Sequence, residues 1–153
     1  RERGLRGHMY EDSIAAPPAI VPPERPRRTR RTAALRSFVR ETQLHVRDFI
    51  HPLFIAEGSK VRKPIDTMPG HAQLSVDQLA AEVAELKALG ITSVLLFGIP
   101  KRKDDTGSGA WDAKGPVPQA IRELKRLAPE LLVIADVCLC EYTAHGHCGI
   151  VRD

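Results

Sequence analysis

The sequence of 153 residues carries a formal net charge of +4 and contains 42% hydrophobic and 27% charged residues. These shares are typical of a soluble globular protein. No apolar run approaches the roughly 20 residues that span a bilayer, and no secretory leader is recognisable, so we expect a cytoplasmic protein that is not integral to a membrane.

The N-terminal residues 1–31 are predicted to form an extended basic arm. Residues 1–21 show neither helical nor strand periodicity, which favours a mobile segment. The stretch from Arg25 to Arg31 carries five arginines in seven positions. Residues 1–40 hold ten arginines against four acids, a balance of +6, so the total of +4 leaves −2 for the remainder. Such a run binds nucleic acid, an anionic surface or another subunit, and the lack of interleaved aromatic residues argues against nucleic acid.

From residue 32 to residue 153 the sequence predicts a folded α/β region. Thr32 is suited to cap a short helix that ends near Glu41. The apolar residues 48–55 are expected to form a first strand, although Pro52 removes one backbone donor. Residues 57–73 contain several Gly and Pro and are expected to form a loop.

The second predicted helix covers residues 76–89. Ser75 and Gln78 match a capping box at its start, and a helical stripe of leucine and valine stops at Gly90. Residues 91–99 are a nearly continuous apolar run, which indicates a strand buried on both faces of a parallel sheet.

A polar loop and a third helix follow that strand. Residues 101–115 are expected to form an active-site lid, because catalytic loops of α/β barrels follow the carboxyl ends of strands. The next helix is predicted over residues 116–128, and a buried strand over 131–137. The order β-α-β-α-β requires parallel strands, as found in both a doubly wound sheet and a barrel. No G-x-G-x-x-G follows the first strand, so a Rossmann nucleotide site has no support.

All three cysteines follow the last predicted strand. Cys138 and Cys140 are two residues apart, so on an extended segment they project to the same side, and a turn at Gly146 and Gly149 allows Cys148 to join them. Three thiolates and one open position suit a zinc ion. A disulfide is disfavoured because the count is odd and a C-x-C bridge is strained.

Two histidines leave a second interpretation of the cluster open. His145 or His147 would complete a closed Cys3His site, as in a small non-catalytic zinc-binding or metal-sensing protein. The carboxylate of Asp136 either takes part in proton transfer near the metal or only accepts hydrogen bonds.

The motif D-V-C-L-C-E-Y-T-A-H-G-H-C-G from Asp136 to Gly149 resembles the signature of the zinc-dependent branch of the porphobilinogen synthase (5-aminolevulinate dehydratase) family. Five further blocks that resemble the family occur in order: V-R-E-T at 39–42, P-L-F-I at 52–55, M-P-G at 68–70, L-F-G-I-P at 96–100, and K-D with G-S between 103 and 108.

The resemblance implies a TIM (β/α)8 barrel with an N-terminal arm, of which residues 32–153 cover about the first three strands. It implies condensation of two 5-aminolevulinate molecules to porphobilinogen with loss of water, in haem biosynthesis. Cys138, Cys140 and Cys148 are then the Zn²⁺ ligands and Asp136 is the catalytic aspartate. The arm is expected to contact a neighbouring subunit in a homo-oligomer, an octamer by resemblance.

The expected activity belongs to a longer chain than this one. A TIM barrel typically needs about 250 residues. In the family, two lysines that form Schiff bases with the substrates lie downstream of the cysteine motif. We therefore expect the 153 residues alone to be inactive.

Overall fold

The computed structural model describes residues 27–150. The predicted mobile segment, residues 1–21, and the first two residues of the basic run lie outside the described residues. The chain divides into two units, Arg1–Gln43 and Leu44–Asp153, and each is described by itself.

The described part of the first unit is short and exposed. A 3-10 helix covers Arg28–Arg30, and α1 covers Ala33–Phe38. Thr32 Oγ1 accepts a hydrogen bond from the backbone N–H of Leu35 at 3.1 Å, which confirms the predicted cap. The helix ends earlier than predicted, and Phe38 at its end is 88% exposed.

The second unit is built on one mixed sheet with the strand order β2-β3-β1-β4-β5. Its strands are β1 (His51–Ala56), β2 (Arg62–Pro64), β3 (Ala72–Leu74), β4 (Ser93–Ile99) and β5 (Leu132–Ala135). The pairs β1–β3, β1–β4 and β4–β5 are parallel, as predicted for a β-α-β-α-β order, and β2 runs antiparallel to β3.

The register brings the carboxyl ends of the central strands to one edge of the sheet. β1 and β4 pair without interruption from His51 with Val94 to Ala56 with Ile99. The backbone N–H of Asp136 donates to Leu96 O at 3.2 Å, which extends the pairing of β5 with β4 by one residue. The loops that follow β4 and β5 therefore leave the sheet from the same edge.

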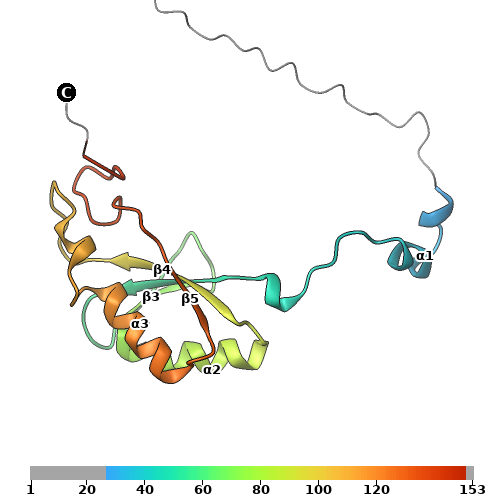
Figure 1. Cartoon of the computed structure of the whole chain (residues 1–153), viewed down its shortest axis with the longest axis horizontal. Coiled ribbons are helices and arrows are strands. Elements are labelled where there is room, and N and C mark those ends of the chain that lie inside the picture. Colours follow the sequence, from blue (N-terminus) through green and yellow to red (C-terminus); the bar gives the residue numbers. More distant parts are fainter. Residues whose placement is uncertain (1–26, 151–153) are drawn as a thin grey trace, which may run out of the picture. The chain divides into compact units, whose positions relative to one another are not determined.

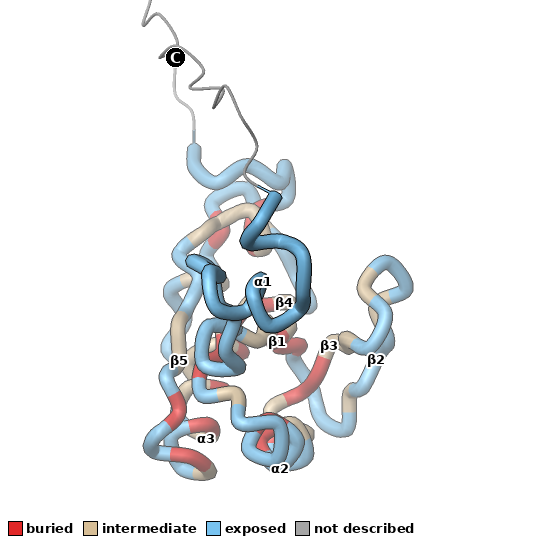
Figure 2. The backbone as a smooth tube through the Cα atoms, turned by 90° about the vertical axis from the view of Figure 1, so that its right-hand side faces the viewer, coloured by how far each residue is buried: buried red, intermediate tan, exposed pale blue. Residues whose placement is uncertain are grey.

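Two helices cover one face of the sheet. α2 (Leu79–Leu89) and α3 (Pro116–Leu127) lie together on the same side (Figure 1). Figure 2 shows buried segments on β1, β3 and both helices, whereas β2 is exposed. The core comprises residues from β1, β3, β4, both helices and the connection between α3 and β5: Leu53, Ile55, Leu74, Leu79, Val83, Leu86, Val94, Leu96, Ala120, Leu124, Ala128 and Leu131.

The other face of the sheet is less covered than predicted. β4 alternates buried residues with half-buried ones, and Phe97 on its half-buried face stacks on Phe54 of β1 at 5.3 Å between ring centroids. β5 was also predicted to be buried, yet Leu132 is 58% exposed because β5 is the edge strand of the described sheet.

The loop predicted for residues 57–73 is wrong in part, because it contains β2 and the first two residues of β3. Three-residue strands are too short to show an alternating pattern, and Pro64 is typical of loops. Pro64 fits here because β2 is an edge strand with only β3 as its neighbour. Pro52 is also accommodated, since β3 pairs with β1 only from Phe54 onward.

The capping box predicted at Ser75 is also wrong. The buried Ser75 hydroxyl accepts from the backbone N–H of Val61 at 2.8 Å and donates to Asp77 at 2.6 Å. A 3-10 helix over Val76–Gln78 precedes α2, so the α-helix itself begins only at Leu79. The Ser75 side chain therefore hydrogen-bonds to Val61, which is distant in the sequence, and does not cap the helix that follows.

The predicted strands differ from the observed ones by one to three residues at most of their ends, including the start of β4 at Ser93 rather than residue 91, while the later helix agrees more closely. β1 begins at His51, because Val46–Asp48 forms a 3-10 helix, and β5 ends at Ala135. α3 begins at Pro116 and ends one residue before its predicted end. Among residues 27–150, no helix combines the length and apolar character needed to cross a bilayer.

Candidate metal centre

The segment from Asp136 to Gly149, which we call the cysteine loop, follows β5 at the carboxyl edge of the sheet. It is not extended as predicted. The backbone N–H groups of Tyr142 and Thr143 both donate to Leu139 O at 2.9 Å, which makes a turn directly after Cys138. A second turn uses Gly146, whose φ of +74° is in the left-handed region, as predicted, whereas Gly149 has no positive φ.

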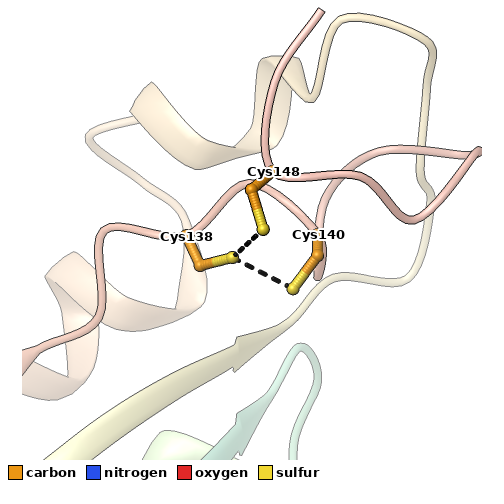
Figure 3. A group of neighbouring side chains, drawn as sticks. All are labelled: Cys138, Cys140 and Cys148. Atoms are coloured by element: carbon orange, nitrogen blue, oxygen red, sulfur yellow. Dashed lines mark hydrogen bonds between the residues drawn. The ribbon is translucent and has the colours of Figure 1, made fainter. Parts of the chain in front are cut away.

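The turn nevertheless brings the three thiols together. The sulfur of Cys138 lies 3.1 Å from that of Cys140 and 2.9 Å from that of Cys148. Figure 3 shows all three side chains pointing toward one centre, with Cys148 on the returning part of the loop. A tetrahedral zinc ion with Zn–S bonds of about 2.3 Å separates its sulfurs by about 3.8 Å. The thiols therefore need to move apart by less than about 1 Å to hold such an ion.

The close contacts divide the protons unequally among the thiols. The hydrogen bond from the Cys148 thiol is the main cause that lowers the pKa of Cys138. The same contacts with Cys138 raise the pKa of Cys148, and raise that of Cys140 to about 12. These contacts favour the thiolate form of Cys138 over those of its two neighbours, and a cation at the centre of the cluster favours all three thiolates.

Two carboxylates lie beside the thiols. The ligand atoms of Asp136, Cys138 and Glu141 lie within 4.8 Å of one another, as do those of the three cysteines. Asp136 is exposed, and its Oδ1 accepts from the backbone N–H of Cys138 at 3.3 Å. The Cys140 thiol donates to Glu141 Oε2 at 3.4 Å.

The histidines do not complete a closed site. Within the described range, no histidine nitrogen joins the group of three sulfurs. His145 Nδ1 accepts from the backbone N–H of His147 at 3.2 Å, and its Nε2 lies 3.3 Å from Asp105 O. His145 Nδ1 is thus engaged within the cysteine loop and Nε2 with the loop after β4, and the geometry does not favour the Cys3His alternative.

The contacts that seat the cysteine loop were not anticipated from the sequence. Tyr142 is 8% exposed and Thr143 is fully buried, although both lie in a polar loop. Thr143 Oγ1 donates to His147 O at 2.9 Å, and the backbone of Asp104 pairs with this part of the loop. The available signal in the sequence was an aromatic residue, Tyr142, among the three cysteines. This signal does not identify the residues against which the ring packs.

A protein-family model described as Delta-aminolevulinic acid dehydratase matches residues 23–153. The proteins named Delta-aminolevulinic acid dehydratase from Halalkalibacterium halodurans and Bacillus subtilis are each 52% identical to this chain, over 130 and 129 residues. The matches cover 85% and 84% of this chain and 40% of each relative. The chain therefore spans about 40% of the length of these curated relatives.

A solved structure has a similar fold. The crystal structure of delta-aminolevulinic acid dehydratase (porphobilinogen synthase) from Toxoplasma gondii ME49, in complex with the reaction product porphobilinogen, matches with a TM-score of 0.77 and 35% identity. The match covers 85% of this chain and 37% of that one. That neighbour is a TIM barrel, so the likeness confirms the predicted fold class.

Proposed function

Because the chain belongs to the delta-aminolevulinic acid dehydratase family, we propose that a protein containing it condenses two molecules of 5-aminolevulinate to porphobilinogen with loss of water. The observation that carries the proposal is the group of three thiols at the carboxyl edge of the sheet, inside the matched region. The activity is assigned to a chain of the relatives' length, since the two Schiff-base lysines implied by the resemblance lie downstream of the cysteine motif.

The metal of this site is proposed to be zinc, bound by Cys138, Cys140 and Cys148. The family is metal-dependent, and soft thiolate ligands select zinc over magnesium or calcium. Zn²⁺ and three thiolates together would give the site a net formal charge of −1, and the bound ion would supply a Lewis acid of moderated strength for a substrate amine or carbonyl group. The loop residues hold the thiolates at one point and leave one position open.

Asp136 is proposed as the catalytic aspartate. Its carboxylate lies within 4.8 Å of the ligand atoms of Cys138 and Glu141, is exposed on the side of the loop, and has one loop hydrogen bond. Among the described residues this hydrogen bond leaves Oδ2 available to orient a substrate group or to accept a proton from it. The negative charge of Asp136 also favours a cationic amine at this position.

The organisation of the chain is proposed in the same terms. Residues 1–31 form a basic arm that contacts a neighbouring subunit of a homo-oligomer, an octamer by resemblance, and residues 32–153 form the N-terminal part of a barrel in a cytoplasmic enzyme. The charge distribution supports the proposal of a basic arm, because residues 1–40 contain ten arginines and only four acidic residues.

A turnover assay on the full-length protein tests the proposal. The protein is incubated with 5-aminolevulinate, and porphobilinogen is detected by its colour reaction with an aromatic aldehyde and by mass. We expect activity that a chelator abolishes and that Zn²⁺, but not Mg²⁺, restores. The Cys138→Ala variant should lack this activity. A zinc-loaded full-length protein that forms no porphobilinogen would contradict the proposal.

A further inference from the structure

A single carboxylate organises the loop that follows β4. Asp104 Oδ1 accepts from the backbone N–H groups of Thr106 and Ser108 and from the Thr106 hydroxyl, each at 3.0 Å. The Ser108 hydroxyl donates to Oδ2. These hydrogen bonds, that of the Ser108 hydroxyl first, hold the pKa of Asp104 well below its ordinary value. The shape of residues 103–108, which we call the Asp104 loop, therefore depends on this side chain.

The backbone of the same residue binds the cysteine loop. Asp104 N donates to Tyr142 O at 3.2 Å, and Ala144 N donates to Asp104 O at 2.9 Å. Together these bonds form a parallel bridge between Asp104 and the fully buried Thr143. Thr143 and its neighbours Tyr142 and Ala144 lie between Cys140 and Cys148, so the Asp104 loop holds the segment that joins two of the thiols.

The two neighbours of Asp104 add contacts on either side of the bridge. Lys103 Nζ donates to Cys140 O at 3.4 Å. His145 Nε2 lies 3.3 Å from Asp105 O. Three consecutive residues, 103–105, thus contact the cysteine loop, and the Asp104 side chain binds the residues that directly follow them.

We propose that Asp104 is a positioning residue for the metal site, which holds its own loop in the shape that places Cys140 and Cys148 against Cys138. The inference rests on the proposed function, because it takes the three thiols as metal ligands. Among the described residues Asp104 makes no hydrogen bond to a sulfur, and it acts through its backbone bridge. Outer residues of this kind typically change metal affinity by about 10- to 100-fold when replaced.

Zinc affinity of the full-length protein tests the inference. Affinity is measured by competition with a fluorescent zinc indicator, and the thiolate-to-cobalt absorption band of the Co²⁺-loaded protein reports how many thiolates bind. Asp104→Ala removes all four hydrogen bonds, and we expect zinc affinity to fall by about 10- to 100-fold with a weaker cobalt band. Asp104→Asn keeps the Oδ1 acceptor, and we expect affinity within a few-fold of the wild type.

Asp77→Ala is the matched control. The Asp77 carboxylate also accepts a serine hydroxyl, that of Ser75 at 2.6 Å, and a backbone N–H, that of Lys60 at 2.9 Å. Asp77 lies in the 3-10 helix before α2. Its side chain hydrogen-bonds to Lys60, Ser75 and Gln78, none of which belongs to the cysteine loop. We expect this variant to lose stability without any change in zinc affinity or in the cobalt band.

The outcomes separate the two proposals. If Asp104→Ala binds zinc as tightly as the wild type, or if Asp77→Ala weakens zinc binding equally, Asp104 has no positioning role. If the wild type binds zinc and Asp104→Ala alone loses affinity, the positioning role is supported. A wild-type protein that binds no zinc overturns the proposed metal site, and with it the premise of the inference.

Discussion

The ring of Tyr142 occupies the space beside Gly98, where any side chain at position 98 would have to lie. A Cβ built on Gly98 would overlap the Tyr142 hydroxyl oxygen, and one on Gly109 would lie 3.2 Å from the tyrosine ring. Tyr142 belongs to the cysteine loop and Gly98 to β4. The ring of Tyr142 therefore packs the cysteine loop, with the proposed metal site, against β4. This packing requires glycine at position 98.

The Gly98→Ala variant tests this seating. The added methyl group forces Tyr142 out of its place, and overpacking of this kind costs about 1–3 kcal/mol. We expect a lower free energy of unfolding in chemical denaturation, and also weaker zinc binding, because the displaced ring carries the loop with it.

The double variant Gly98→Ala/Tyr142→Phe provides the control for that prediction. Removing the hydroxyl relieves the closest overlap, so we expect part of the lost zinc affinity to return. Strictly additive effects of the two substitutions on zinc affinity would contradict the proposed contact.

The hydrophobic core gives a matched pair of leucines on one helix. Leu86 of α2 is 3% exposed and belongs to the core, whereas Leu89, one turn later, is 57% exposed. Leu86→Ala is expected to lower the free energy of unfolding by about 2–5 kcal/mol. Leu89→Ala should change it by about 0.5 kcal/mol or less. Equal losses, measured by urea denaturation, would show that α2 does not pack as described.

Asp77 is expected to contribute to the acid sensitivity of the fold. The hydrogen bond from the Ser75 hydroxyl, together with that from the Lys60 backbone, lowers the pKa of Asp77 from 3.8 to about 2. A folded-state pKa below the unfolded value stabilises the fold above pH 3.8, and this contribution is lost as the pH falls toward 2. The urea midpoint of Asp77→Asn should therefore fall less between pH 4 and pH 2 than that of the wild type. Parallel pH profiles of the two proteins would count against these hydrogen bonds.

The longer elements could be predicted because they carry their own signals. The helix α3 and the apolar run of β4 each extend over more than one turn or pleat. Pro116 marks the start of α3, and Pro100 follows the end of β4. The order of these elements then implied parallel strands. The full burial of Ala120 on α3 could not be predicted in the same way, since a small side chain is buried only where a neighbouring element comes close.

The remaining features depend on partners far away in the sequence. β3 forms because it pairs with β1. The Ser75 hydroxyl accepts a hydrogen bond from the backbone of Val61 instead of capping the predicted helix. The convergence of the thiols was expected from an extended segment, but a turn at Leu139 produces it. The bridge between Asp104 and Thr143 joins residues that no local pattern connects.

The role of Asp136 is tested by a substitution that preserves its shape. Asp136→Asn keeps an acceptor for the backbone N–H of Cys138 but removes the negative charge. If the carboxylate takes part in proton transfer, kcat should fall by about 100-fold or more while zinc affinity changes little. A kcat within a few-fold of the wild type would mean that Asp136 only supports the loop.

The most direct test of the account is X-ray absorption at the zinc edge of the full-length protein loaded with one equivalent of Zn²⁺. We expect three sulfur ligands at about 2.3 Å and one lighter ligand, which changes when substrate is added. A first shell dominated by nitrogen and oxygen would contradict the central claim that Cys138, Cys140 and Cys148 bind the metal. A histidine as an unchanging fourth ligand would instead support a closed, non-catalytic site.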